Sequence, residues 1–357
     1  MADIVLFGAS GFTGRLVAGA LGLRGASYAV AGRDLGRLEA VARAHGAEDV
    51  RAAAVGDVDG LVRALRDARV LVSCVGPFAE LGATAVEAAL EAGVHYLDCT
   101  GEASFVAGLV RDHAARAEDA GVAVAPAMGF DEVPADVAAT LAVAGSSGGA
   151  ELVLTYAMPS GASRGTIRSA VGALSATVPW DEGGVIRQIG AGERRRWAPM
   201  PPPLGPRLAV SFPLAEAHLA PLHLDVGLPA TFVTAGRPAR VVLGQRRAAA
   251  GALATRYGRT LVERLATMGQ GPADGGPSGR WTILAEARWA TGRRNVVLAG
   301  RDPYGLTAQT MGAAAVAMAE PGYPGRGVMA PVGAVGLEPL KRVLESCGAT
   351  IESFEPI

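Results

Sequence analysis

The chain contains 357 residues, which is enough for about two domains of roughly 150 residues, each with its own hydrophobic core. Half of the residues are hydrophobic and 19% are charged, so the composition excludes an intrinsically disordered protein. Because 33 basic residues balance 34 acidic ones, the formal net charge is −1, and no overall field draws the chain to nucleic acid or to an anionic membrane. A small-molecule partner, free or attached to a carrier, is therefore favoured.

Cysteine and histidine spacing argues against a disulfide framework and against a metal site. The three cysteines, at positions 74, 99 and 347, are odd in number and form no C-x-x-C motif. The five histidines show no metal-ligand spacing. The N-terminus lacks a signal-peptide pattern and no apolar run reaches ~18 residues, so we expect a cytoplasmic protein without a membrane span or a bound metal.

The first part of the chain alternates short apolar runs with Ala-rich segments of helical period. The runs are continuous, as in strands covered on both faces, and the segments between them are long enough for crossover helices. This pattern predicts an α/β fold, a Rossmann-type doubly wound parallel sheet over residues 1–145, with a further helix over 135–143 and a linker at 145–149. The expected strands are residues 4–7, 28–31, 51–55, 70–74, 94–97 and 122–126.

From residue 150 the strands become longer and the helices fewer, which predicts a second, α+β substrate domain over residues 150–325 on a mixed or antiparallel sheet. We expect strands over 151–158, 281–290 and 295–301, covering helices over 166–178 and 246–268, and loops over 197–206 and 269–279. Further helices are expected over 304–319 and 337–346, and the segment 326–357 is expected to pack back on the first domain.

A glycine-rich turn, Gly8-Ala9-Ser10-Gly11-Phe12-Thr13-Gly14, follows the first expected strand. Gly8 allows a tight turn, Gly11 lets a pyrophosphate approach the backbone, and Gly14 lets the following helix pack closely. The amide groups at the helix N-terminus then bind the anion. The place of the turn between the first strand and the first helix favours a dinucleotide site, to which Ser10, Phe12 and Thr13 also belong, over a turn without a ligand.

The second expected strand ends in Ala31-Gly32-Arg33-Asp34, where a dinucleotide fold meets the adenosine ribose. An acidic residue there binds both ribose hydroxyls of NAD, whereas an arginine binds the 2′-phosphate of NADP. We interpret Asp34 as a helix N-cap and assign Arg33 and Arg37 to the phosphate, which predicts NADPH. Asp57, after the third strand, either faces the adenine amino group or only caps the next helix.

The carboxyl ends of the fourth, fifth and sixth expected strands should meet at the nicotinamide half of the cofactor. After the fourth strand, Gly76 allows close approach of the ribose and Pro77 fixes the turn, with Val75 and Phe78 beside them. The polar residues that these strand ends gather are Tyr96, Asp98, Thr100, Glu102, Asp131 and Asp136. Each of them alone is as typical of a cap or a turn as of a catalytic site.

Together these motifs resemble the saccharopine dehydrogenase-like oxidoreductases, among which the trans-acting enoyl reductases of lipid and polyketide biosynthesis are most similar. The resemblance is carried by residues 3–14, 31–33, 75–78, 95–102 and 129–136, and a weaker likeness extends to 163–166, 276–278 and 327–331. It implies a Rossmann domain, an α/β substrate domain and an NADPH-dependent reductase. It also implies that Thr100, with Gly101 beside it, and Asp131 line the junction of nicotinamide and substrate.

The tyrosines exclude one route of carbonyl reduction, because none of the six has a lysine four residues later, as the Tyr-x-x-x-Lys pair of short-chain dehydrogenases requires. Hydride addition to a polarised C=C or C=N bond needs a nicotinamide about 3–3.5 Å from the acceptor carbon and a donor for the developing charge. Tyr96 or a backbone amide near Thr100 would supply that donor, and Tyr96 and Asp131 are the candidate catalytic residues. We therefore expect a reductase of an enoyl, enone or imine group in a biosynthetic intermediate.

Residues 161–165 match the G-x-S-x-G motif of serine hydrolases, with His218 or His223 as the base. Ser163 more simply caps the following helix, where it and Arg168 would bind an anionic group of the substrate.

Other readings of the sequence stay open. The run Arg194-Arg195-Arg196 beside Trp197 would dock an acyl-carrier protein or form a solvated face. A dehydrogenase of imines or amino acids and an NADPH-binding sensor without turnover are the alternative functions, and a homodimer is compatible with the sequence.

Overall fold

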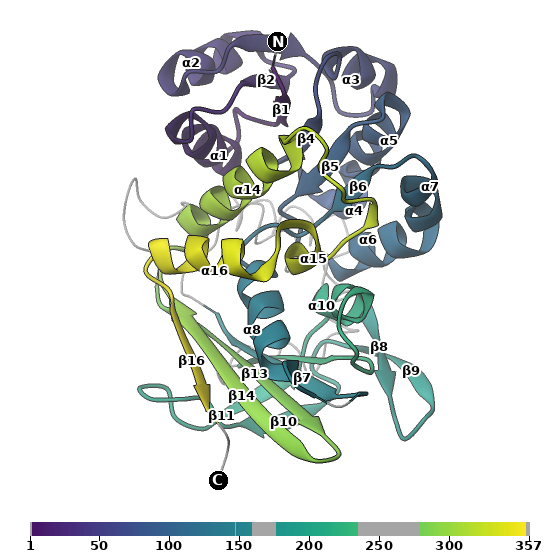
Figure 1. Ribbon diagram of the computed structural model, residues 1–357, viewed down its shortest axis with the longest axis vertical. Coiled ribbons are helices and arrows are strands. Elements are labelled where there is room, and N and C mark those ends of the chain that lie inside the picture. The colour runs from purple at the N-terminus through teal and green to yellow at the C-terminus, as the bar shows by residue number, and fades with distance from the viewer. Residues whose placement is uncertain (1, 147, 159–175, 235–278, 355–357) are drawn as a thin grey trace, which may run out of the picture. The chain divides into compact units, whose positions relative to one another are not determined.

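The computed structural model describes residues 2–146, 148–158, 176–234 and 279–354, which belong to two compact units (Figure 1). Unit 1 comprises Met1–Gly101, Phe105–Val133 and Tyr304–Cys347. Unit 2 comprises Glu102–Ser104, Pro134–Pro303 and Gly348–Ile357. Each unit therefore combines segments that are distant in the sequence, whereas the expected domains are continuous stretches.

Unit 1 is built on a parallel sheet of seven strands in the order β15-β6-β5-β4-β1-β2-β3. The strands are β1 (Ile4–Phe7), β2 (Tyr28–Gly32), β3 (Asp49–Ala52), β4 (Val70–Ser73), β5 (His95–Asp98), β6 (Ala123–Ala125) and β15 (Gly327–Val328). The order reverses between β1 and β4, and doubly wound sheets bind their ligands at such a switch point. The expected Rossmann sheet is confirmed.

The central strands form because their apolar runs can be covered on both faces. Every residue of β1 and β4 is buried, and Val5, Phe7 and Leu71 belong to one core cluster of unit 1. Burying each such side chain stabilises the fold by about 1.5–3 kcal/mol. The helices that follow the strands are α1 (Phe12–Leu23), α2 (Leu35–His45), α3 (Val58–Ala64), α4 (Phe78–Leu81), α5 (Ala83–Ala92), α6 (Ala103–Gly108), a π-helical turn (Leu109–His113) and α7 (Ala114–Asp119).

The C-terminal part of the chain adds three helices, α14 (Pro303–Ala319), α15 (Pro331–Val335) and α16 (Leu337–Ser346). Helices α14 and α16 confirm the two helices expected there, whereas α15 was not expected. Helix α14 packs beside α1 (Figure 1), and a Cβ on Gly312 would lie 3.1 Å from the Ala20 Cβ. The Arg24 guanidinium also donates to the Gln309 side chain at 2.7 Å. A segment nearly 300 residues away in the sequence thus completes unit 1.

Unit 2 is built on a mixed sheet in the order β10-β11-β12-β7-β13-β14-β16, in which β12 and β7 are parallel and the other neighbours are antiparallel. Its strands are β7 (Glu151–Ala157), β10 (Arg195–Ala198), β11 (Arg207–Ser211), β12 (Ala230–Thr234), β13 (Trp281–Trp289), β14 (Gly292–Gly300) and β16 (Thr350–Phe354). A separate hairpin joins β8 (Thr177–Asp181) to β9 (Ile186–Gly190), and the described helices are α8 (Val133–Val143), α10 (Glu216–Leu219) and the 3-10 turn Ala220–Leu222. The expected mixed sheet is confirmed.

Several expected element boundaries differ from those in the structure. The third strand covers Asp49–Ala52 instead of 51–55. The helix expected over 166–178 is wrong at its end, because Thr177 begins β8, and Trp197, expected in a loop, lies in β10. The helix expected over 246–268 and most of the loop over 269–279 lie outside the described residues. Within the described part of the chain, no helix is long and apolar enough to cross a membrane.

Candidate functional site

The glycine turn lies at the carboxyl end of β1, an interior strand of the unit 1 sheet. Gly8 has a φ of +86°, and its amide donates to the Ala31 carbonyl at 3.0 Å. The Gly11 amide donates to the Gly8 carbonyl at 3.0 Å, and α1 begins at the next residue. A Cβ on Gly14 would lie 2.3 Å from the Gly8 carbonyl oxygen, so a larger residue would push α1 off the turn.

The N-terminus of α1 also differs from those of its neighbours. Asp34 and Asp57 cap α2 and α3 through their side chains, whereas no side chain caps α1 at its N-cap residue Gly11. Phe12 and Thr13, both partly exposed, form the first turn of α1, and Ser10 precedes it. The backbone cradle and the uncapped helix end fit the pyrophosphate of a dinucleotide.

The two arginines assigned to the 2′-phosphate are held differently. The Asp34 carboxylate accepts from the Arg37 backbone amide at 3.1 Å, which confirms that Asp34 is an N-cap. The same carboxylate pairs with the Arg37 side chain, with 3.2 Å between Oδ2 and Nε. Arg33 is exposed at the end of β2 and has no ion pair among the described residues. Arg33 is therefore the arginine whose guanidinium is available to a phosphate.

Asp57 acts as a helix cap. Its Oδ1 accepts from the Gly60 amide at 2.8 Å, at the start of α3. This geometry favours capping over adenine recognition, the other role considered for this residue.

The loop after β4 approaches the glycine turn. A Cβ on Gly8 would lie 2.7 Å from the Val75 Cγ2 and 3.2 Å from the Cys74 carbonyl carbon. The Gly76–Pro77 peptide is cis, and Phe78, the first residue of α4, is buried with its ring 5.9 Å from that of Phe105. The residues expected at the nicotinamide half, Val75–Phe78, thus lie next to Gly8 at the switch point of the sheet.

Asp98, at the end of β5, organises the next loop by accepting three hydrogen bonds in the interior. The Tyr96 hydroxyl donates to Oδ2 at 2.7 Å, and the backbone amides of Thr100 and Ala127 donate to Oδ1 at 2.8 and 2.9 Å. Tyr96 is fully buried, and burial, followed by the charge of Asp98, raises the pKa of its hydroxyl well above the ordinary value. The hydroxyl of Tyr96 and the Thr100 amide, both considered as donors to substrate, are therefore used to hold Asp98.

Asp131, in the loop after β6, is the acidic residue of this edge that titrates near neutrality. Burial raises the pKa of its carboxyl group to about 6. A Cβ on Gly101 would lie 2.8 Å from the Asp131 Oδ2, so the glycine leaves room for the carboxyl group. A carboxyl group with such a pKa can hold a proton and transfer it close to neutral pH.

Two cysteines that are distant in the sequence meet at the same edge of the sheet. Cys74 follows β4 and Cys99 follows β5, and these strands pair in register up to Ser73 and Asp98, so the two cysteines lie side by side. The interaction with Cys74, and then burial, raise the pKa of the Cys99 thiol well above its usual range.

Helix α14 contributes to the site, although the sequence analysis assigned it to the second domain. The Thr307 hydroxyl accepts from the Phe130 amide at 2.9 Å, and the Thr310 hydroxyl donates to the Met128 carbonyl at 2.7 Å. The Tyr304 ring packs edge-on against Phe12, with 5.2 Å between the centroids. Helix α14 thus holds the loop that carries Asp131 and contacts the first residue of α1. The local sequence of α14 could not indicate these contacts, because the loop of Asp131 and the start of α1 each lie more than 170 residues away from α14.

The remaining polar candidates lie in unit 2. The Asp136 Oδ1 lies 2.7 Å from the His223 Nε2, and the Asp136 side chain is almost completely buried. Glu102 also belongs to unit 2. His223, one of the two histidines considered as a hydrolase base, is therefore paired with Asp136, and the Ser163 and Arg168 candidates lie outside the described residues.

The arginine run before Trp197 is partly neutralised within unit 2. Arg194 pairs with Glu182, and Arg196 pairs with Glu286, its Nη2 lying 2.9 Å from the carboxylate Oε1. Arg195 and Trp197 are exposed on β10. Two of the three charges proposed for carrier docking are thus already paired.

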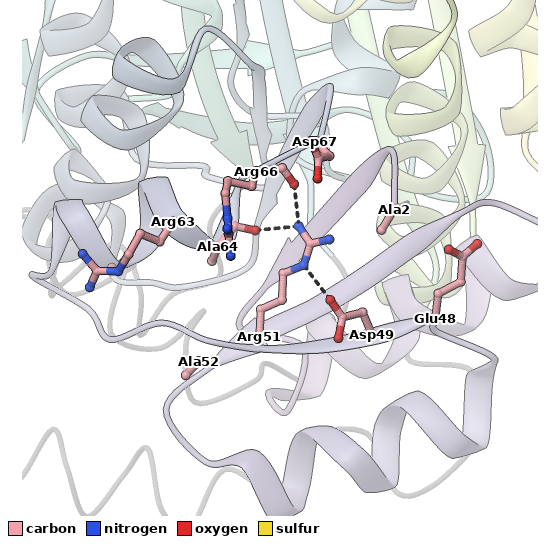
Figure 2. A pocket seen from close by; sticks show the side chains of 10 residues that line it. Ala2, Glu48, Asp49, Arg51, Ala52, Arg63, Ala64, Arg66 and Asp67 are labelled. Atoms are coloured by element: carbon pink, nitrogen blue, oxygen red, sulfur yellow. Dashed lines mark hydrogen bonds and ion pairs between the residues drawn. The ribbon is translucent and has the colours of Figure 1, made fainter.

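A cavity of about 720 Å³ lies at the opposite end of the unit 1 strands from the glycine turn, beside the start of β3 (Figure 2). Its lining includes Arg51, whose guanidinium contacts Asp49 at 3.0 Å and the carbonyls of Ala64 and Arg66 at 2.7 and 3.1 Å. These contacts fix the turn after α3. The cavity lies at the amino ends of the strands and contains none of the predicted site residues.

Comparison with known proteins supports the dinucleotide assignment. Residues 4–125 match the family described as "Saccharopine dehydrogenase NADP binding domain". This match confirms the resemblance inferred from the motifs and indicates NADP(H) as the cofactor of unit 1.

The chain is also similar to individual proteins. It is 36% identical over 147 residues to a "Lipid droplet localized protein" of Caenorhabditis elegans, covering 38% of this chain and 34% of that protein. It is 37% identical over 142 residues to a "Trans-acting enoyl reductase" of Mycobacterium tuberculosis, again covering 38% of this chain and 34% of the relative. The chain thus matches only about a third of the length of these relatives.

Among solved structures, the fold matches an apo saccharopine dehydrogenase (L-Glu forming) of Saccharomyces cerevisiae. The TM-score is 0.64 with 14% sequence identity, and the match covers 100% of both chains. At this identity the match establishes the fold of the chain.

Proposed function

We propose that this protein, whose residues 4–125 match the saccharopine dehydrogenase NADP-binding domain, is an NADPH-dependent reductase that adds hydride to a C=C bond of an enoyl or enone group. The observation that carries the proposal is the common edge of the unit 1 sheet. The glycine turn, the loop Val75–Phe78 and Asp131 follow β1, β4 and β6, and the carboxyl ends of parallel strands lie at one edge. A pyrophosphate cradle and a titrating carboxyl group on that edge suit a reductase.

In this proposal, different residues of unit 1 bind different parts of the cofactor. The turn Gly8–Gly14 and the uncapped α1 hold the pyrophosphate, and Arg33 binds the 2′-phosphate. The loop Val75–Phe78 lies against the nicotinamide ribose. When bound, NADPH supplies the hydride.

Proton delivery to the reduced substrate is assigned to Asp131. Its carboxyl group takes up a proton near pH 6 and lies beside Gly101, where Thr100 and Gly101 border the substrate. Tyr96, the other candidate catalytic residue, is fully buried and donates to Asp98, which supports a positioning role instead. In this scheme Tyr96 and Asp98 hold the loop that presents Thr100 and Gly101.

Two kinds of substrate bond, C=C and C=N, suit this site. The name of the mycobacterial relative, a trans-acting enoyl reductase, favours a C=C bond. A C=N bond makes the same demands on the protein, namely a held nicotinamide and one proton, and is the second candidate. A carrier-bound substrate, a homodimer and a cytoplasmic location belong to the same proposal, and free thiols such as Cys74 and Cys99 suit a reducing compartment.

The test follows NADPH oxidation by its absorbance with three probes: a crotonyl thioester of N-acetylcysteamine, cyclohexenone and a cyclic imine. Turnover of the thioester or the enone is expected, with a loss of at least about tenfold in Asp131→Asn, because removal of a general acid costs about 10²–10⁴-fold at most sites. Turnover of the imine alone would favour the second candidate. NADPH binding without any turnover would instead favour a sensor, and absence of NADPH binding would overturn the cofactor assignment.

A further inference from the structure

Cys74 and Cys99 occupy equivalent positions on neighbouring strands. In the parallel pair β4–β5, Ser73 lies opposite Asp98, so the next residues, Cys74 and Cys99, follow in register. Neighbouring strands are about 4.8 Å apart, and the Cα atoms of a disulfide are about 4.4–6.8 Å apart. Residues in register on adjacent strands point their side chains to the same face. The backbone therefore brings the two Cα atoms within the range that a disulfide can span.

The two thiols are reduced and lie side by side. Both cysteines are free and half-buried, and the interaction with Cys74 is the main cause of the raised pKa of the Cys99 thiol. The third cysteine, Cys347, follows α16 at the other end of the chain. Only the first two cysteines thus share one edge of the sheet.

We propose that Cys74 and Cys99 are a redox modification site, which hydrogen peroxide oxidises to a reversible disulfide. One thiolate attacks the peroxide, the O–O bond breaks, and a sulfenic acid and water form. The second sulfur then attacks the sulfenic sulfur, so that the S–S bond forms, the S–O bond breaks, and a second water leaves. In total, two thiols lose two electrons and two protons, and one peroxide is reduced to two molecules of water.

The site is joined to the dinucleotide turn through its backbone. A Cβ on Gly8 would lie 3.2 Å from the Cys74 carbonyl carbon, and Val75 and Gly76 follow directly. A Cβ on Gly129 would lie 3.4 Å from the Cys99 Cβ, so the backbone of Gly129 lies close to Cys99. A disulfide would draw these packed segments together and shift the loop after β4. The effect on NADPH, though not the disulfide itself, rests on the proposed function.

Two consequences follow for the reaction. Because the thiolate is the reactive form and the pKa of Cys99 is raised, oxidation should be slow at neutral pH and should accelerate as the pH rises. Oxidation and NADPH binding should also oppose each other, since coupling between two sites is reciprocal. NADPH should therefore slow the oxidation.

The experiment treats the full-length chain with hydrogen peroxide and identifies disulfide-linked peptides by mass spectrometry without reduction. Wild type and the matched control Cys347→Ser should yield the 74–99 linked peptide, which dithiothreitol removes, whereas Cys74→Ser and Cys99→Ser should not. Failure of the wild type to form this link, or oxidation that stops at a sulfinic acid, would overturn the proposal. Either variant, Cys74→Ser or Cys99→Ser, suffices if the other does not fold.

NADPH affinity is measured separately by fluorescence before and after oxidation. We expect about tenfold weaker binding by the oxidised wild type, which corresponds to about 1.4 kcal/mol, and recovery with dithiothreitol. Unchanged affinity of the cross-linked protein would overturn the coupling to the cofactor while leaving the disulfide established. A protein that forms the link but never binds NADPH would contradict the proposed function, not the modification site.

Discussion

Arg33 is the residue on which the choice between NADPH and NADH depends. It is exposed and has no ion pair among the described residues, whereas Arg37 is paired with Asp34. A hydrogen bond to a charged group contributes about 1.5–3 kcal/mol, so Arg33→Ala should weaken NADPH binding about tenfold to a hundredfold and leave NADH binding unchanged. Titration of both nucleotides by fluorescence measures this, with Arg37→Ala as the matched control. An equal loss in both variants would show that the two arginines share the phosphate.

Asp131 should make stability depend on pH. Burial raises the pKa of its carboxyl group to about 6 from the ordinary value of 3.8, so between pH 3.8 and pH 6 the folded state binds more protons than the unfolded state. The free energy of unfolding should then fall as pH rises from 4 to 7, by an amount of order 1–3 kcal/mol from this group. Asp131→Asn should remove this loss, as urea denaturation at both pH values would reveal. The exposed Asp119→Asn is the control, and an identical pH dependence in wild type and Asp131→Asn would refute the assignment.

Tyr96 should matter to stability more than to chemistry. Its buried hydroxyl is one of three donors to the buried Asp98 carboxylate, and Tyr96→Phe removes that donor while preserving the ring. Leaving a buried charged acceptor short of a partner costs about 1–3 kcal/mol of unfolding free energy. We expect that loss in urea denaturation, with kcat reduced by less than about tenfold. A far larger fall in kcat at unchanged stability would show that Tyr96 acts in catalysis.

At the scale of elements, the packing of α1 on the glycine turn leaves no room for a side chain at Gly14. A Cβ on Gly14 would lie 2.3 Å from the Gly8 carbonyl oxygen, whereas a Cβ on Gly19, on the same helix, would lie 3.5 Å from the nearest His45 ring atom. Gly14→Ala should therefore displace the helix and abolish measurable NADPH binding. Gly19→Ala should bind NADPH normally and raise stability by about 0.5–1 kcal/mol, because alanine is the better helix former. Calorimetric titration and thermal melts compare the two, and normal binding by Gly14→Ala would refute the packing argument.

The elements also show where local sequence reasoning works. Ile4–Phe7 and Val70–Ser73 were predictable as buried strands, because continuous apolar runs need cover on both faces. The end of the helix expected over 166–178 was wrong, because Thr177 and Val178 pair with Gly190 and Ile189 of β9 instead. Strand pairing depends on a partner elsewhere in the chain, and the helical period of a segment carries no information about that partner.

At the scale of the molecule, unit 1 is completed by the C-terminal part of the chain. Met311, Ala314, Ala315 and Met318 of α14 are fully buried, and Thr310 donates to the Met128 carbonyl. A fragment of residues 1–145, the first domain as expected from the sequence, lacks this cover and also lacks β15. We expect that fragment to lose cooperative unfolding and NADPH binding, since burial of each methionine contributes about 1.5–3 kcal/mol. Circular dichroism melts and fluorescence titration test this.

The control for that experiment is a chain in which residues 1–145 are joined by a flexible linker to residues 304–347. It should regain cooperative unfolding and NADPH binding, because it restores the segments of unit 1. Full binding by the shorter fragment would show instead that the first domain folds as expected from the sequence alone.

Local patterns were sufficient to predict the Rossmann sheet, the glycine turn and the use of NADP: apolar runs, glycines at fixed spacing, and an arginine directly after a strand. The packing of the elements established that Tyr96 donates to Asp98, that Cys74 lies beside Cys99, that His223 is paired with Asp136, and that α14 holds the loop of Asp131. Each of these contacts except the first joins residues at least 25 positions apart, and the first depends on burial. Burial and long-range contacts depend on how distant segments pack together, so the sequence of a single segment does not predict them.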